Sequence, residues 1–366
     1  MNHNICLDLI EESGIRKYRN IAKQKGMIDF TIGDTCIDLS DKVKGGIIQE
    51  LIDNHTHYEM TQGDLSVREL ISKKENGLSF APSEVLLTIG ATEGIYVALT
   101  ALINPGDEVI LFKPYYSLYK NVVIQNGAKI KEVDLLHEID IKGVISENTK
   151  TIVFNTPNNP TGLLHLDVMD KIIDIVQKKD IYVIIDATYD EIIYEKRSID
   201  YSKWKVIRDK LIIVKSLSKS HAMTGLRLGY VLANSSIMKY LVMVHQMCIS
   251  CIPSIYRKAY LEALNEDIKG NLIQYEAKRN YLISKLSEMN IEYIRPEGAF
   301  YVCLYVPSNK SSTEYTHELI EYAKIVCVPG IYFGDDRIVR LSFSTKWDNL
   351  ISGMNQLRDY MDNKFK

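Results

Sequence analysis

The sequence predicts an α/β fold: a mostly parallel sheet covered by helices on both faces, followed by a smaller α+β lobe. Short β-branched runs alternate with longer amphipathic stretches through the first two thirds of the chain, which is typical of parallel strands joined by helices. The last third has a long helical region and then separate short strands. A chain of 366 residues is also long enough to divide into two lobes.

The individual elements follow from these runs, taken in chain order. A helix is expected at 14–24, where it would pack with the second lobe. Strands of the large sheet are expected at 84–89, 107–112, 150–155, 181–186 and 210–216, with helices at 92–103, 115–127 and 166–179. A long helical region is expected at about 253–289, and further strands at 291–294, 300–306, 325–328 and 338–344.

These elements predict three parts of the chain. An N-terminal segment at 1–39 packs with the small domain, a large α/β domain occupies 40–250, and an interdomain helix with the small domain occupies 251–366. The sequence has no low-complexity segment between them. We therefore expect the two domains to share an extensive interface with a cleft.

Composition excludes several classes of function. The net charge of −3 and the lack of long like-charged runs argue against nucleic acid as a partner. The chain has no secretory signal pattern and no apolar stretch of membrane-spanning length, so a cytoplasmic protein that does not bind membranes is expected. Six scattered cysteines fit a reducing compartment, and the C-x-x-C pair at 248–251 is interpreted as ordinary packing rather than a metal or redox site.

Unusual residues cluster where the predicted strands end, which is where open parallel sheets bind ligands. "TIGATEG" at 88–94 joins a strand to a helix start, a geometry that can hold an anion but that also occurs in plain turns. "NTPNNPTG" at 155–162 places several amides in a proline-rigid turn behind a buried strand. Asp186 ends a very apolar strand, where a carboxylate needs a cation or strong hydrogen bonds unless it caps the next helix.

Lys219 in "KSLSKSHAMTGLRLGY" follows another apolar strand. A lysine at a dry strand end is a candidate Schiff-base former, since desolvation lowers its pKa. Ser216, Ser218 and Arg227 lie close in sequence and could bind a phosphate. These neighbouring residues suit a lysine that is joined to a phosphate-bearing aldehyde.

The motifs together resemble one family, the fold-type I pyridoxal-phosphate enzymes, and specifically the class I and II aminotransferases related to aspartate aminotransferase. The resemblance covers nearly the whole chain and rests on seven motifs that occur in the family's order. They are "YEMTQGDLSVREL", "TIGATEG", "KPYYSLY", "NTPNNPTG", "DATYDEIIY", "SLSKSHAMTGLRLGY" and "RLSFS". The resemblance implies a large domain that binds pyridoxal 5'-phosphate on a mostly parallel seven-stranded sheet.

The resemblance also implies roles for matched positions around the cofactor. Lys219 would hold it as an internal aldimine and later move the proton, and Asp186 would face the pyridinium nitrogen. Asn159 and Tyr189 would bind the phenolic oxygen, and Tyr115 would stack on the ring. The phosphate cup would consist of Gly90, Ala91, Thr92, Ser216, Ser218 and Arg227.

Further matches concern the substrate and the assembly. Arg340 would grip the substrate's α-carboxylate, assisted by Asn159 and by the backbone of Gly33. Tyr58 matches a tyrosine that reaches the phosphate of the neighbouring subunit, so a homodimer with composite active sites is expected. Two stretches depart from the family's pattern, a short connection at 68–85 and "HAMTG" after the lysine, and neither removes a matched group.

The implied activity is transfer of an amino group between an L-amino acid and a 2-oxo acid by a ping-pong mechanism. Carbon–sulfur β-lyases, decarboxylases and cyclising enzymes use the same constellation and remain alternatives, as does a catalytically degenerate regulatory protein, which the filled catalytic positions disfavour. Dicarboxylate-specific relatives carry an additional arginine near the segment at 245–254. None is present there, which disfavours aspartate and glutamate as the preferred donor.

Overall fold

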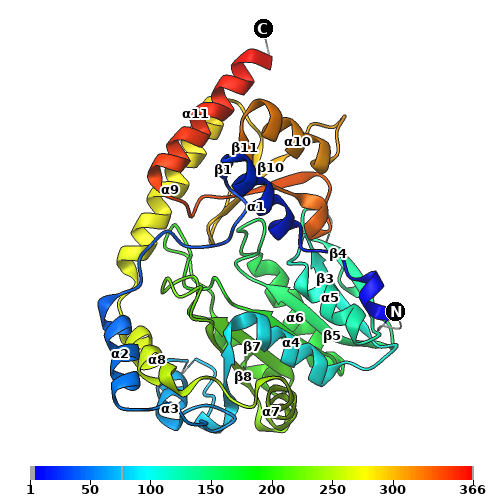
Figure 1. Cartoon of the computed structure of the whole chain (residues 1–366). Coiled ribbons are helices and arrows are strands. Elements are labelled where there is room, and N and C mark those ends of the chain that lie inside the picture. The colour runs from blue at the N-terminus through cyan, green and yellow to red at the C-terminus, as the bar shows by residue number, and fades with distance from the viewer. Residues whose placement is uncertain (1–4, 76, 138, 365–366) are drawn as a thin grey trace.

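The computed structural model describes residues 5–75, 77–137 and 139–364, which form a large and a small lobe (Figure 1). The large lobe contains a seven-stranded sheet in the order β2-β8-β7-β6-β5-β3-β4. Its strands are β2 (Val85–Ile89), β3 (Glu108–Lys113), β4 (Lys129–Asp134), β5 (Thr149–Asn155), β6 (Tyr182–Asp186), β7 (Leu211–Ser216) and β8 (Leu228–Ala233). Only β8 runs antiparallel to its neighbours in this sheet.

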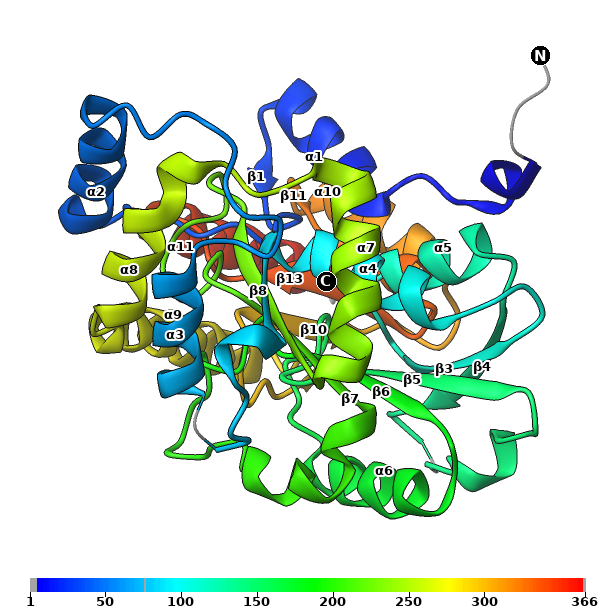
Figure 2. The same ribbon diagram turned by 90° about the horizontal axis from the view of Figure 1, so that it is seen from below.

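Helices cover both faces of this sheet, as Figure 2 shows. α4 (Gly90–Leu102), α5 (Leu118–Gln125) and α7 (Ser235–Ile249) lie on one face, and α6 (Leu166–Lys178) lies on the other. Successive side chains of a strand point to opposite faces of the sheet. Leu111 and Ile184 pack in the core on the face covered by α4, while Ile110 and Ile185 pack in the core on the face covered by α6. Burial on both faces explains why the central strands are apolar throughout.

The predicted α/β fold class with a mostly parallel seven-stranded sheet is confirmed. Two of its strands, β4 and β8, were not predicted individually. β4, "KIKEVD", is an edge strand with only one fully buried residue, so its composition resembles a surface loop. β8 begins directly after the polar segment that follows Lys219 and has no helix before it, unlike the strands of the predicted alternation.

A helical layer flanks the β2 edge of the sheet. α2 (Asp41–Ile52), α3 (Leu65–Lys74) and α8 (Arg257–Asn265) pack on one another, and Tyr260 joins the large-lobe core with Val67 and Ile71. The division of the chain at residues 39/40 and 250/251 stays a prediction. The packing of α8 favours extending the large lobe to the end of that helix.

The small lobe combines a four-stranded antiparallel sheet with helices. Its order is β12 (Val328–Pro329), β13 (Ile338–Ser342), β10 (Tyr301–Tyr305) and β9 (Tyr293–Ile294). β1 (Ile28–Asp29) pairs in parallel with β11 (Ile325–Val326). The helices are α1 (Gly14–Lys25), α10 (Ser312–Tyr322), α11 (Trp347–Lys364) and the long α9 (Lys269–Glu288), which runs between the lobes in Figure 1.

The N-terminal helix belongs with the small lobe, because Tyr18 and Ala22 of α1 pack against Ile320 and Val326. The expected long helical region is divided between α8 and α9. Short 3-10 helices occupy Ile5–Leu9, Pro82–Glu84, Lys142–Val144, Tyr201–Lys210, Ser254–Tyr256 and Gly330–Phe333.

Three features bear on the excluded functions. Among the described residues, no single helix is long and apolar enough to cross a membrane; α7 with Ser254–Asn265 passes that test only as a pair bent by 118°. The described residues contain no group of three His, Cys, Asp or Glu side chains that could hold a metal ion. Cys248 and Cys251 are free thiols.

Candidate active site

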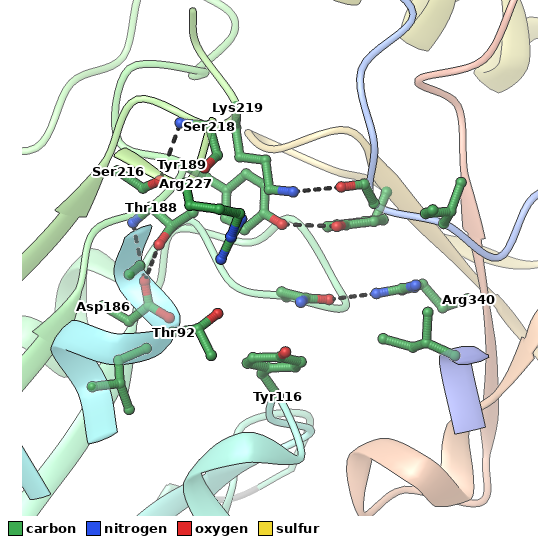
Figure 3. A pocket seen from close by; sticks show the side chains of 17 residues that line it. Thr92, Tyr116, Asp186, Thr188, Tyr189, Ser216, Ser218, Lys219, Arg227 and Arg340 are labelled. Carbon is green, nitrogen blue, oxygen red and sulfur yellow. Dashed lines mark hydrogen bonds between the residues drawn. The ribbon is translucent and has the colours of Figure 1, made fainter. Parts of the chain in front are cut away.

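A cavity of about 220 Å³ lies where the carboxyl ends of the large sheet's strands meet the small lobe. β6 and β7 contribute Asp186 and Ser216, β10 and β13 contribute Tyr301 and Arg340, and α1 contributes Ile15. In Figure 3, Asp186 and the serines lie on one side of the cavity and Arg340 lies on the other. The cavity therefore joins residues from both lobes and from three distant parts of the chain.

Lys219 projects into the cavity from the turn that follows β7. Its Nζ donates a hydrogen bond to the carbonyl of Gly33 and lies 5.8 Å from the centroid of the Phe300 ring. Burial lowers the pKa of Lys219 to about 8, and the nearby Asp34 carboxylate opposes that shift. A substantial share of the amine is therefore neutral at neutral to slightly alkaline pH, as a nucleophile or base requires.

Asp186 ends β6 and is buried beside the cavity. Its Oδ1 accepts hydrogen bonds from the backbone N–H of Thr188 at 3.1 Å and from the Thr188 hydroxyl at 2.6 Å. Its Oδ2 accepts one from the Tyr119 hydroxyl at 2.6 Å. Burial raises the pKa of Asp186, and these donors oppose the shift by favouring the ionised form. The residue caps no helix, because a turn follows β6.

An anion-binding cup forms at the start of α4. Gly90 has φ +68°, which lets the chain turn sharply from β2 into the helix, and no side chain caps the first turn. Ala91 and Thr92 of that turn line the cavity, and the free N–H groups and dipole of a helix start favour an anion there. A Cβ at Gly90 would lie 3.0 Å from Nη2 of Arg227. Glycine therefore allows the guanidinium to approach the helix start.

Two serines complete the cup from the β7 side. Ser216 accepts a hydrogen bond from the backbone N–H of Ser218 at 3.1 Å, which fixes the turn between them. The Ser218 hydroxyl is buried and has no hydrogen-bond partner among the described residues. A buried hydroxyl without a partner is costly, so it indicates a ligand oxygen at this position.

The amide-rich turn after β5 is ordered by its own side chains. Asn155 donates to the carbonyl of Asp186 at 2.9 Å and accepts from the backbone N–H of Asn159 at 2.6 Å. Asn158 donates to the carbonyl of Pro114 at 3.2 Å and accepts from Thr161. This network holds the Asn159 side chain in the cavity lining, in direct contact with Arg340.

Arg340 is completely buried, and its hydrogen-bond partners among the described residues include no carboxylate. Nη1 donates to Oδ1 of Asn159 at 2.9 Å, Nη2 donates to the carbonyl of Thr31, and Nε has no partner. The guanidinium carbon lies 4.3 Å from the Tyr301 ring centroid and 4.8 Å from that of Phe333. A buried cation held this way requires an anion, and its fork geometry suits a carboxylate.

Tyr189 and Gly33 also line the cavity. The Tyr189 hydroxyl shares a 2.7 Å hydrogen bond with that of Tyr301, and burial raises the pKa of Tyr189 well above its ordinary value. A Cβ at Gly33 would lie 1.9 Å from the Tyr301 hydroxyl oxygen, so only glycine fits there. The backbone of this segment can therefore approach the cavity closely.

Tyr115 and Tyr116 are placed differently around the cavity. Tyr115, expected to stack on a bound ring, does not line the cavity; its hydroxyl points to Glu132, at 2.7 Å. Tyr116 lines the cavity instead, and its ring faces the interior in Figure 3. Two adjacent tyrosines carry no signal that tells which one turns inward, because that depends on where α5 begins. Burial raises the pKa of Tyr116.

Tyr58 lies apart from this cavity in the single chain. Its side chain is 92% exposed, and it lines surface hollows near Arg257 and Leu51. The structure thus brings together eleven of the fourteen site residues that the sequence indicated, places Gly90 directly behind them, and leaves Tyr58 and Tyr115 outside. The eleven are Gly33, Ala91, Thr92, Asn159, Asp186, Tyr189, Ser216, Ser218, Lys219, Arg227 and Arg340.

Several lining residues were not found from the sequence. Thr188 and Tyr301 carry polar groups, while Ile15, Ile32 and Ile95 give the cavity apolar walls. A hydroxyl two residues after a strand-ending carboxylate is a usable signal for Thr188, because that spacing is typical of an Asx-type turn. The isoleucines resemble ordinary core residues, so only the fold reveals them.

The arrangement has a clear chemical capability. It combines a buried amine, a helix start suited to an anion, a buried carboxylate and a guanidinium without a carboxylate partner among the described residues, all around one cavity. Such a site can hold a phosphorylated aldehyde on the amine and a carboxylate on the far side.

Comparisons with known proteins agree with this capability. Residues 25–352 match the family model for aminotransferase class I and II. The chain is 34% identical to a probable N-acetyl-LL-diaminopimelate aminotransferase of Bacillus subtilis, covering 95% of this chain and 93% of the relative. It is 32% identical to an aspartate aminotransferase of Pyrococcus horikoshii, covering 97% and 96%. Among solved structures, aspartate aminotransferase of Thermus thermophilus with maleate superposes with a TM-score of 0.92 at 27% identity, covering 98% and 100%.

Proposed function

The chain belongs to the class I and II aminotransferases, and from that premise we propose that it binds pyridoxal 5'-phosphate through Lys219 and transfers an amino group between an L-amino acid and a 2-oxo acid. The observation that carries the proposal is the buried amine of Lys219, whose pKa is lowered to about 8 at the edge of an anion cup. The named relatives are aminotransferases, which favours transamination over β-elimination, decarboxylation or cyclisation.

The residues present fit this cofactor. The unpartnered Ser218 hydroxyl and the space that Gly90 leaves beside Arg227 suit a phosphate at the start of α4. Asp186 suits the ring nitrogen, and Tyr116 suits the ring face. The cup also includes Ala91, Thr92 and Ser216, and Asn159 and Tyr189 would bind the phenolic oxygen.

Bound pyridoxal phosphate would supply an electron sink for the negative charge that develops at the substrate's α-carbon. The neutral Nζ of Lys219 would take the proton from the substrate's α-carbon and would donate a proton back later in the reaction. The carboxylate of Asp186 would keep the ring nitrogen protonated. Arg340 would hold the α-carboxylate, and burial at the lobe interface would exclude water.

The cavity walls support a preference for donors without a second carboxylate. Besides Lys219, Arg227 and Arg340, no lysine or arginine lines the cavity among the described residues. Ile15 and Ile32 provide apolar contacts instead. We therefore propose that apolar or neutral side chains are preferred over those of aspartate and glutamate, with ping-pong kinetics and a cytoplasmic location as parts of the same proposal.

A homodimer with shared active sites is also proposed. Large apolar side chains are exposed along α2, the segment after it and α7; they are Ile48, Leu51, Ile52, Tyr58, Met60, Tyr240, Met243 and Met247. Leu51, Tyr58 and Ile249 line one continuous hollow, so these elements form one surface. An apolar surface of this kind supports a subunit interface, and Tyr58 on it would reach the partner's phosphate cup.

A stopped-flow screen tests the activity. The protein loaded with pyridoxal phosphate is mixed with single amino acids in the absence of any oxo acid, and the visible spectrum is followed. Transamination predicts conversion to the pyridoxamine phosphate form with one equivalent of 2-oxo acid, and recovery on adding a second oxo acid. Release of ammonia or carbon dioxide in that half-reaction would instead indicate a lyase or decarboxylase.

A further inference from the structure

We propose that Tyr119 is a positioning residue for this reaction: its hydroxyl holds the Asp186 carboxylate ionised and in one orientation toward the ring nitrogen of pyridoxal phosphate. The inference rests on the proposed function, because it concerns how the chain prepares Asp186 for that cofactor. Tyr119 itself does not line the cavity, so it acts only through Asp186.

The contact between the two residues is short and buried. The Tyr119 hydroxyl donates to Oδ2 of Asp186 at 2.6 Å, and both side chains are buried. Tyr119 lies in the first turn of α5, with its ring packed edge-on against Tyr116 at 5.9 Å between centroids. One short segment therefore reaches the site twice: Tyr116, two residues before α5, lines the cavity, and Tyr119 in α5 contacts the carboxylate behind it.

The hydrogen bonds on Asp186 leave one acceptor position for a ligand. A carboxylate offers about four lone-pair positions, two on each oxygen. Two donors from Thr188 take those on Oδ1, and Tyr119 takes one on Oδ2. Figure 3 shows the second oxygen turned toward the cavity, on the side of Tyr116. The remaining position on Oδ2 is therefore the one available to a cationic N–H.

Tyr119 also opposes the effect of burial on Asp186. Burial raises the pKa of the carboxyl, while the hydrogen bonds from Thr188 and Tyr119 lower it. A protonated Asp186 could not stabilise a pyridinium. Without the Tyr119 donor, the carboxyl would keep its proton to higher pH, and the cofactor's ring nitrogen would lose its anionic partner. Among the described residues, the titratable or charged groups that interact electrostatically with Asp186 are Tyr116, Tyr119, Tyr189, Tyr201, Lys219 and Tyr301.

The test replaces Tyr119 by Phe and measures binding of pyridoxal phosphate to the apoprotein by absorbance titration. Tyr119→Phe should raise the dissociation constant about 10-fold, the usual effect of losing a hydrogen bond to a charged group. In an Asp186→Asn background the same change should have less than about 2-fold effect, because the coupled pair is already broken. Tyr194→Phe is the matched control, since Tyr194 is equally buried but donates to the Ala299 carbonyl.

A pH titration of the bound cofactor's visible band distinguishes positioning from simple packing. Tyr119→Phe should raise the pH midpoint of the band's acid-side transition by about one unit, and Tyr194→Phe should leave that midpoint unchanged. If Tyr119→Phe does not fold, 3,5-difluorotyrosine at position 119 keeps the shape with a more acidic hydroxyl, and should move the midpoint downward.

Unchanged affinity and midpoint in Tyr119→Phe, or equal losses with and without Asp186, would overturn the role of Tyr119 while leaving the proposed function intact. Failure of the wild-type chain to bind pyridoxal phosphate at all would instead overturn the proposed function.

Discussion

Replacing Arg340 by Met should remove the grip on the substrate's α-carboxylate while preserving the packing of the side-chain stem. Arg340 is fully buried between Tyr301 and Phe333, its Nε has no partner, and no described carboxylate neutralises it. A substrate carboxylate would therefore receive a bidentate pair from a desolvated, preoriented guanidinium. Truncating one partner of such a pair costs about 3 kcal/mol, which is on the order of 100-fold in kcat/KM.

The assay measures the half-reaction of each variant with an amino acid and with the amine that lacks its carboxylate. The wild-type protein should strongly prefer the amino acid, and Arg340→Met should lose most of that preference while its affinity for pyridoxal phosphate stays the same. Arg340→Lys should recover only part of the activity, because an ammonium cannot make two parallel bonds. Arg358→Ala, which removes a partly exposed arginine paired with Glu288 outside the cavity, is the control. Activity of Arg340→Met within about 3-fold of wild type would refute the assignment.

Three further predictions concern the cofactor site. The rate at which pyridoxal phosphate attaches covalently should rise with pH around a midpoint near 8. Burial lowers the pKa of Lys219 to about 8, and only the neutral amine attacks an aldehyde. A midpoint near the ordinary lysine value of about 10, measured by stopped flow, would contradict this prediction. Tyr116→Leu should weaken pyridoxal phosphate binding about 10-fold through lost ring stacking, and Tyr115→Leu should weaken it less; an equilibrium titration that reverses this order would restore Tyr115 as the stacking residue. Mixed dimers of Lys219→Ala and Tyr58→Ala subunits should regain activity at low cofactor concentration that neither parent shows, and verified hybrids that stay at the parental average would place Tyr58 in its own subunit.

The sequence was sufficient for the central strands and for most of the site. Strands such as Thr149–Asn155 and Leu211–Ser216 are buried on both faces, so their apolar runs mark them clearly, and each ends in a polar motif. The carboxyl ends of parallel strands meet at one edge of the sheet, which is why Lys219, Asp186 and Asn159 come together as expected.

Other features depend on packing that the sequence does not display. The edge strand Lys129–Asp134 is too polar to be recognised as a strand from the sequence. Ile15 and Ile32, which form apolar walls of the cavity, resemble ordinary core residues. Whether Tyr115 or Tyr116 faces the cavity depends on the rotation of the chain as α5 begins. The contact between Tyr119 and Asp186 spans 67 residues, and only the folded chain brings the two side chains together.

The most direct test of the central claim is borohydride reduction of the protein loaded with pyridoxal phosphate, followed by peptide mapping. A single stable adduct is expected on Lys219, at one per chain, and it should be absent from Lys219→Ala. The nearby Lys215, which is equally buried but paired with Glu75 and Asp190, should remain unmodified. An adduct on Lys215 or any other lysine, or no adduct at saturating cofactor, would contradict the assignment of Lys219 as the cofactor-binding lysine.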